Sequence, residues 1–289
     1  MLWLARALWL ILPFTAGPVF ADALLTTDRP FQLSLSLGLW GVWALMLVAF
    51  MVPRTQTLTL VRIVAPAAVV FTAWAAVATE NGSFALAALA LLTTGFAAIT
   101  ALSAPVGDAL VDGSSYGDES RFLLRTPGAL LMGPIQLVWI VLVVGAAAGP
   151  ILLAAELWIA GAIALVAGWA TVYVALPILH RLSDRWLVFV PAGLVVHDKT
   201  ALREPQLFRK ESIDVLGPAP ADTELEDLSL NGLGLALRAK LKEPSKIVPN
   251  QRVEDDSKVT ITDITGFIVS PNRPGAVLDE ASSRSVPIG

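Results

Sequence analysis

Residues 151–179 read ILLAAELWIAGAIALVAGWATVYVALPIL, and residues 180–185 read HRLSDR. The first stretch holds a single charged residue, Glu156, and exceeds the roughly 20 apolar residues that a helix needs to cross a hydrocarbon layer. The second stretch is polar and carries charges of both signs. This abrupt change predicts that a membrane-spanning helix ends near Leu179 and that a water-soluble domain begins at His180.

The charge distribution divides the whole chain at the same point. The 289 residues include 20 Lys and Arg and 24 Asp and Glu, of which only six basic and eight acidic residues precede His180. Charged residues make up 15% of the chain, against about 25% in a typical soluble protein. We therefore expect residues 1–179 to form a transmembrane helical bundle and residues 180–289 to form a small soluble domain.

Further apolar stretches in the first part meet the same length criterion and are bounded by charge, proline or glycine, as helix ends are. The predicted spans are residues 31–52, 60–79, 83–103, 128–148 and 151–179, with the last two separated at Gly149-Pro150. Residues 1–23 are either a further, uncleaved helix or a signal peptide, because Arg6 precedes an apolar stretch that ends in a small-x-small sequence. The sequence thus predicts five to six transmembrane helices.

Basic residues predict the orientation, because cytoplasmic loops carry an excess of Lys and Arg. With six helices and the N-terminus inside, Arg29 is the one arginine of this region on the outer face. The inner face receives Arg6, Arg54, Arg62, Arg121, Arg125, Arg181 and Arg185. We therefore expect a multi-pass protein of the cell membrane with its C-terminal domain in the cytoplasm.

The longest connection between predicted helices is residues 104–127, which is glycine-rich and polar. Four acidic residues lie in it without the alternate ligand spacing and closing bidentate Glu of a calcium loop: Asp108, Asp112, Asp118 and Glu119. We therefore predict a solvated cytoplasmic loop here and no metal site.

Polar groups inside apolar helices are functional candidates because they are costly at membrane depth. Glu156 is predicted to lie six residues into the last helix, where it either reaches the headgroup region or binds a proton or cation. Gln136 follows Pro134 and either satisfies the carbonyl that this proline frees or bridges helices. Small residues at four-residue spacing, such as Gly145 and Gly149, predict close helix packing.

The pattern after Pro177 changes to that of strands. Residues 186–190 and 194–197 read as two strands joined by the turn Pro191-Ala-Gly193, and residues 233–241 alternate apolar and polar side chains. Further predicted strands are residues 206–208, 212–216, 246–248, 258–261 and 266–269, and residues 272–281 read as a capped helix. The prediction is a small antiparallel β domain closed by one helix.

Three stretches of this domain, residues 185–198 (RWLVFVPAGLVVHD), 207–210 (LFRK) and 267–278 (FIVSPNRPGAVL), carry a resemblance. Together with residues 60–68 (LVRIVAPAA), they resemble a family of actinobacterial multi-pass membrane proteins. The strand order and final helix are similar to bacterial pleckstrin-homology-like (PH-like) domains. The family has no established activity or site residues, so the resemblance implies none.

Several function classes find no support in the sequence. The chain has no cysteine, its two histidines (His180 and His197) lack metal-ligand spacing, and no basic stripe indicates nucleic acid. We find no catalytic, cofactor or metal signature and expect no enzyme. The leading hypothesis is a membrane-anchored interaction or scaffold protein, with the lipid bilayer and another membrane or cytoplasmic protein as partners. The alternative is a small-solute or ion transporter that uses Glu156 and Gln136.

Overall fold

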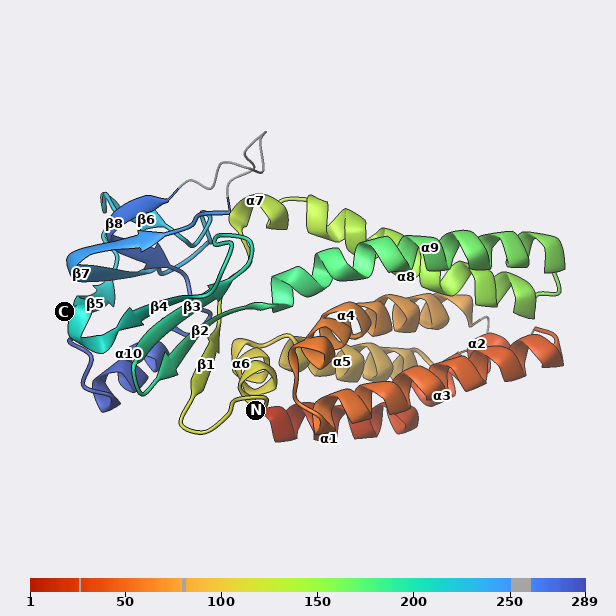
Figure 1. The fold of residues 1–289 in the computed structure, drawn as a ribbon. Coiled ribbons are helices and arrows are strands. Elements are labelled where there is room, and N and C mark those ends of the chain that lie inside the picture. Colours follow the sequence, from red (N-terminus) through yellow and green to blue (C-terminus); the bar gives the residue numbers. More distant parts are fainter. Residues whose placement is uncertain (26, 80–81, 251–260) are drawn as a thin grey trace. The chain divides into compact units, whose positions relative to one another are not determined.

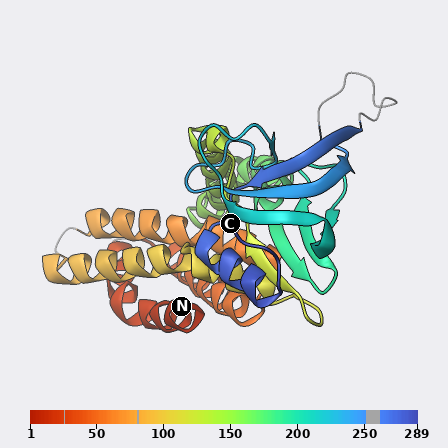
Figure 2. The ribbon, with the colours of Figure 1, turned by 90° about the vertical axis from the view of Figure 1, so that its left-hand side faces the viewer.

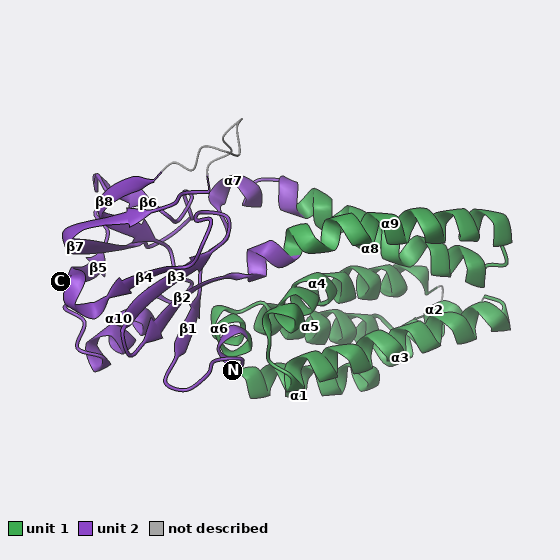
Figure 3. Cartoon of the chain, viewed as in Figure 1, with its two compact units in different colours: residues 1–110, 136–179 green, residues 111–135, 180–289 purple. Residues whose placement is uncertain are grey.

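The structure is a computed structural model that describes residues 1–25, 27–79, 82–250 and 261–289 (Figure 1). The chain forms two compact units (Figure 3). Unit 1 comprises Met1–Leu110 and Gln136–Leu179, and unit 2 comprises Val111–Ile135 and His180–Gly289. Unit 2 is therefore assembled from two stretches of sequence that flank the last two long helices.

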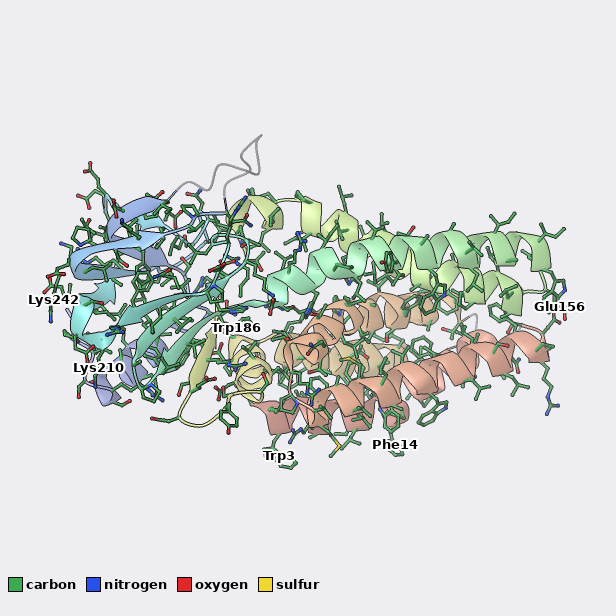
Figure 4. All side chains as sticks on the ribbon, in the orientation of Figure 1. Trp3, Phe14, Glu156, Trp186, Lys210 and Lys242 are labelled. Carbon is green, nitrogen blue, oxygen red and sulfur yellow. The ribbon has the colours of Figure 1, made fainter. Side chains whose placement is uncertain are left out.

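Unit 1 contains the long apolar helices. Among the described residues, 6 helices are long and apolar enough to cross a membrane. They are Leu2–Leu24 (α1, Leu2–Thr15, with α2, Gly17–Leu24), α3 (Arg29–Met51), α4 (Thr55–Ala78), α5 (Phe84–Ala101), α8 (Pro134–Ala154) and α9 (Trp158–Ser183). Large apolar side chains also point outward, as for Phe14 and Trp3 (Figure 4). Helices that are apolar all round are typical of membrane spans.

The first long helices are joined by tryptophan and arginine side chains. The indole of Trp9 on α1 donates to the backbone oxygen of Trp43 on α3 (3.1 Å), and the indole of Trp43 donates to the oxygen of Trp9 (2.9 Å). Arg6 donates to the oxygen of Phe50 near the end of α3 (2.7 Å from Nη2). In an apolar surrounding such pairs satisfy polar groups that have no water to bind.

The α8–α9 pair packs through glycines, as the small-residue spacing predicts. A methyl group at Gly168 on α9 would collide with the backbone of Gly145 on α8. One at Gly149 would lie 2.5 Å from the Cα atom of Leu165. The two backbones approach each other as closely as the absence of side chains permits.

The predicted break at Gly149-Pro150 is wrong. α8 continues through Pro150 to Ala154, and the connection to α9 consists of residues 155–157. Gly149 serves the close contact with Leu165 instead of ending a helix. A proline within a membrane helix costs one backbone hydrogen bond, which such helices tolerate.

Unit 2 contains two four-stranded sheets whose neighbouring strands are antiparallel except for β6 and β8. The first sheet has the order β1 (Ser120–Leu123), β2 (Arg185–Val190), β3 (Gly193–Asp198) and β4 (Gln206–Arg209). The second has the order β5 (Ile213–Pro218), β7 (Leu237–Ile247), β8 (Thr262–Val269) and β6 (Glu226–Asp227). Figure 2 shows β7 and β8 as long neighbouring strands.

One apolar core joins the two sheets. Phe208 of the first sheet and Phe267 of the second stack with ring centroids 4.3 Å apart. Leu187, Phe189 and Leu194 belong to the same buried cluster, as do Val277 and Ala281 of helix α10 (Pro274–Ser283). The inward residues of β2 alternate along the strand, which is the period-two pattern of a strand with one face in the core.

The strands agree with the sequence in part. The hairpin predicted over residues 186–197 is confirmed, but β7 begins at Leu237 and not at residue 233. Gly234 has φ +103, and the side chain of Arg125 fills the space where a Cβ would stand, so the strand cannot start there. The predicted strand 246–248 is the end of β7, and residues 258–260 lie outside the described residues.

The prediction of a solvated loop over residues 104–127 is wrong at residues 104–112 and 120–123, whereas residues 116–118 between them are exposed. Residues Ala104–Asp112 form α6 and residues Ser120–Leu123 form β1, an edge strand of the first sheet. Asp108 is only 6% exposed. The glycine spacing concealed a strand that becomes stable only through pairing with β2, from which the α8–α9 pair separates it in sequence.

We predict that Gly168→Ala lowers the melting temperature of the full chain in detergent. The added methyl group meets backbone, which cannot rotate away, and overpacking of this kind costs about 1–3 kcal/mol. The matched control is Gly38→Ala in α3, where a methyl group would meet nothing within 4 Å. Equal melting temperatures for the two variants would contradict the close packing of α8 and α9.

Candidate functional site

The base of the first sheet is held by a buried ion pair. The guanidinium of Arg185, at the start of β2, donates from Nε to Oδ2 of Asp198 at the end of β3 (2.8 Å), and its Nη2 lies 2.6 Å from the same oxygen. Both side chains are almost fully buried, at 1% and 0% exposed. Nη1 of Arg185 donates to the backbone oxygen of Arg125, just beyond β1 (2.8 Å). One cation thus links the ends of three strands.

The carboxylate of Asp198 is satisfied on its other side as well. Its Oδ1 accepts from the backbone N–H of Thr200 (2.9 Å) and from the hydroxyl of that residue (2.5 Å). A buried charge with this many partners is typical of a structural element, and removing one partner leaves the other charge buried without compensation.

We predict that Arg185→Met destabilises unit 2 by about 3–5 kcal/mol, because Asp198 then keeps a buried charge without its cation. Denaturation of the full chain in detergent, followed by near-UV circular dichroism, measures this change. The control is Lys199→Ala, which removes the ion pair between Lys199 Nζ and Asp184 Oδ2 (2.8 Å), in which the lysine is 60% exposed and the aspartate 16%. An exposed pair contributes about 0–1 kcal/mol, so comparable losses in both variants would contradict the assignment.

His197 lies on the other face of β3 from the core. Its ring stacks on the indole of its cross-strand neighbour Trp186, with centroids 4.3 Å apart and planes inclined by 1°. Desolvation by burial lowers the pKa of His197 below 6.5, as do the positive charges of Lys199 and Arg121, while Asp184 opposes them. His197 Nε2 lies 3.8 Å from Asp184 Oδ1.

We predict that unit 2 loses stability as the pH falls below about 6.5. The lowered pKa means that the unfolded chain binds the proton more readily than the folded one, so the stability due to neutral His197 is present above the unfolded pKa and lost below it. Denaturation midpoints measured between pH 8 and pH 5 test this. His197→Phe keeps the stacked ring and is expected to flatten the profile; an unchanged profile would reject the assignment.

The edges of the two sheets differ in how their outward backbone groups are satisfied. On β1, the N–H of Arg121 donates to Asp112 Oδ1 (2.9 Å), and the oxygen of Leu123 accepts from the N–H of Asn272 (2.8 Å). On β5, the N–H of Leu216 donates to the oxygen of Pro287 (2.8 Å). The β6 edge is two residues long. Covering or shortening an edge prevents unwanted strand pairing.

The β4 edge is different. Lys210 N–H donates to the oxygen of Ala192, so the backbone groups of Lys210 point toward β3. Successive residues of an antiparallel strand point their backbone groups alternately toward and away from the partner strand. The N–H and C=O groups of Leu207 and Arg209 therefore point away from β3. Ser212 Oγ donates to the oxygen of Arg209 (2.7 Å). Among the described residues, neither outward N–H group of β4 has a backbone hydrogen-bond partner, and the Leu207 side chain is 40% exposed. We define the candidate site as this edge, Gln206–Arg209.

The end of β4 adjoins a cavity of about 260 Å³, whose lining includes Pro191, Gly193 and Lys210. Lys210 directly follows β4, and Figure 4 labels it on this unit. An exposed strand edge beside a pocket provides main-chain hydrogen bonds for affinity and a cavity for selectivity.

The two residues predicted for transport lie elsewhere. Glu156 lies in the α8–α9 connection with φ 60, at the tip of the helix pair (Figure 4), and not six residues into a helix. The misplaced helix start at Ile151 caused this error. Gln136 lies in the first turn of α8 with its side chain exposed. The prediction that Gln136 bridges helices stays a prediction.

Residues of the β4 edge were predicted as a strand but not as a site, because neither Leu207 nor Arg209 carries a chemical signature. Among the described ranges, no group of three His, Asp or Glu side chains could hold a metal ion. Compared with family models, with curated proteins and with solved structures, the chain matches none of them.

Proposed function

We propose that this protein is a multi-pass integral membrane protein whose β domain recruits another polypeptide by strand addition at β4. The observation that carries this proposal is the pair of outward N–H groups at Leu207 and Arg209, against which no strand or side chain of the described residues lies. An added strand would complete these hydrogen bonds at little cost in protein rearrangement.

The membrane helices fit the role of an anchor. Six helices long and apolar enough to cross a membrane support the proposal that the protein is anchored in a lipid bilayer. The arginine distribution favours the cell membrane with the β domain in the cytoplasm, so the partner is a cytoplasmic protein or the cytoplasmic part of another membrane protein. Two sheets with α10 packed into their core are consistent with a PH-like domain closed by a helix, and with the actinobacterial membrane family that the sequence resembles.

We predict that Leu207→Pro reduces the recovery of a specific partner at least about tenfold, the effect of losing about 1.4 kcal/mol of binding energy. Proline removes the outward N–H, and an edge strand tolerates it on the solvent side. The measurement is quantitative mass spectrometry of proteins that co-purify with the full chain in mild detergent.

The matched control is Leu207→Ala, which shortens the side chain but keeps the N–H group. We expect it to retain more partner than Leu207→Pro. Melting curves of both variants confirm that the fold persists. If the two variants recover the same amount of partner as the unchanged protein, strand addition at β4 is rejected.

A further inference from the structure

Two stretches without charged residues meet on unit 2. Residues 126–155 and 228–237 contain no Asp, Glu, Lys or Arg, although charged residues are frequent elsewhere in residues 180–289. The first stretch begins before α8 and includes the short helix α7 (Gly128–Leu131), which directly precedes α8 (Figure 1). Apolar sequence therefore extends from the long helix into unit 2.

The second stretch lies against α7. The N–H of Gly128 donates to the oxygen of Asn231 (3.2 Å), and Nη1 of Arg125 donates to the oxygen of Leu233 (2.7 Å). A methyl group at Gly128 would lie 3.2 Å from Cγ of Leu233. The loop of residues 231–235 and α7 thus form one continuous surface.

This surface presents large apolar side chains to the outside. Leu131 and Met132 are 39% and 84% exposed, and Leu233 and Leu235 are 56% and 58% exposed. We call these four residues the apolar rim. In water, such a cluster leaves apolar area in contact with solvent, which costs free energy in proportion to that area.

Hydrogen bonds within the loop hold its backbone in place. Asp227 accepts from the N–H of Ser229 (2.8 Å) and, through its other carboxylate oxygen, from the N–H of Asn231 (2.9 Å). Leu230 has φ 55, a region that leucine rarely adopts, and its side chain packs against the core. The loop therefore directs Leu230 inward while Leu233 and Leu235 stay exposed.

Both connections to the long helices leave unit 2 at the end that carries the rim. Met132 precedes the start of α8 at Pro134 by two residues, which reach at most about 7 Å. α9 ends at Ser183 and β2 begins at Arg185. Arg185 donates to the oxygen of Arg125, and Arg125 in turn holds the backbone of Leu233.

We propose that the apolar rim lies in the interfacial layer of the lipid bilayer and gives unit 2 a second contact with the membrane besides its covalent connections. In a protein anchored by α8, Met132 lies within a few ångströms of the helix entry, so the bilayer is the apolar partner within reach. Side chains of this kind insert about 5–10 Å into the boundary between headgroups and acyl chains. The inference rests on the proposed membrane anchor and uses no residue of β4.

The experiment measures quenching of an environment-sensitive fluorophore by lipids that carry a nitroxide near the headgroup end of the acyl chain. The full chain has no cysteine, so Leu235→Cys gives one labelled position after reconstitution into phosphatidylcholine and phosphatidylglycerol vesicles. The positive reference is Val144→Cys, 58% exposed in the middle of α8, quenched by a nitroxide near the end of the acyl chain.

The negative reference is Lys242→Cys on β7. This exposed residue lies five positions beyond the start of β7 at Leu237, about 17 Å along the strand. We expect the label at position 235 to be quenched at least about twofold more strongly than the label at position 242, because only the first lies in lipid.

A pair of variants separates the apolar rim from the covalent connection. Leu233→Asp adds a charge that resists insertion, and we expect it to lower the quenching at position 235 at least about twofold. The matched control, Leu233→Met, keeps an apolar side chain and is expected to retain the quenching. Equal quenching in both variants would mean that the connection alone holds the label near lipid, and would overturn the proposal.

Other outcomes identify which claim fails. A label at position 235 that is quenched as weakly as the one at 242, while position 144 is quenched, rejects the rim and leaves the anchor intact. Absence of quenching at position 144 rejects the anchor itself. Blue-shifted emission at position 235 without quenching by lipid means that a second copy of the chain covers the rim, and rejects the lipid contact.

Discussion

The guanidinium of Arg185 is the contact on which the β domain depends most. It reaches the carboxylate of Asp198 at the end of β3 and the backbone of Arg125 beyond β1, so one side chain fixes three strands at one end of the sheet. A buried cation is tolerated where an opposite charge pairs with it, and this one has a carboxylate and a carbonyl oxygen beside it. In the register of these strands, Phe189 lies in the core and the Leu207 side chain is exposed.

The first sheet pairs two strands, β1 and β2, that the long helices α8 and α9 separate in sequence. β1 precedes α8 and β2 follows α9, so the sheet closes only when the two ends of this helix pair come together. When α8 and α9 pack through their glycines, the flexible part of the connection between β1 and β2 becomes shorter. A shorter flexible connection costs less entropy to close.

Much of the architecture could be predicted from the sequence, because apolar length and strand alternation are local signals. Local signals also misled at specific places. Gly149-Pro150 reads as a helix end, but the glycine is required by the approach of Leu165, which is distant in sequence. The segment 120–123 is too short for its sequence to predict a strand when its partner β2 is not known. The charge of Glu156 made it a candidate site within a helix, but the observed helix boundaries place it in the connection between α8 and α9.

The candidate site could not be predicted from the sequence, for a different reason. An open strand edge consists of backbone groups, which every residue has, and it is recognised only once the neighbours of each strand are known. Leu207, Arg209 and Leu216 carry no motif. Their roles follow from which backbone groups point outward and from whether residues such as Pro287 cover them.

The measurement that tests the central claim most directly is photo-crosslinking in living cells. A benzophenone amino acid replaces Leu207 on the open edge or, in a control, Leu235, which is 58% exposed and lies outside the strands. The account predicts a crosslink to another polypeptide from position 207 that is absent from position 235. No crosslink at position 207, or the same products from both positions, would contradict the assignment of β4 as a docking edge.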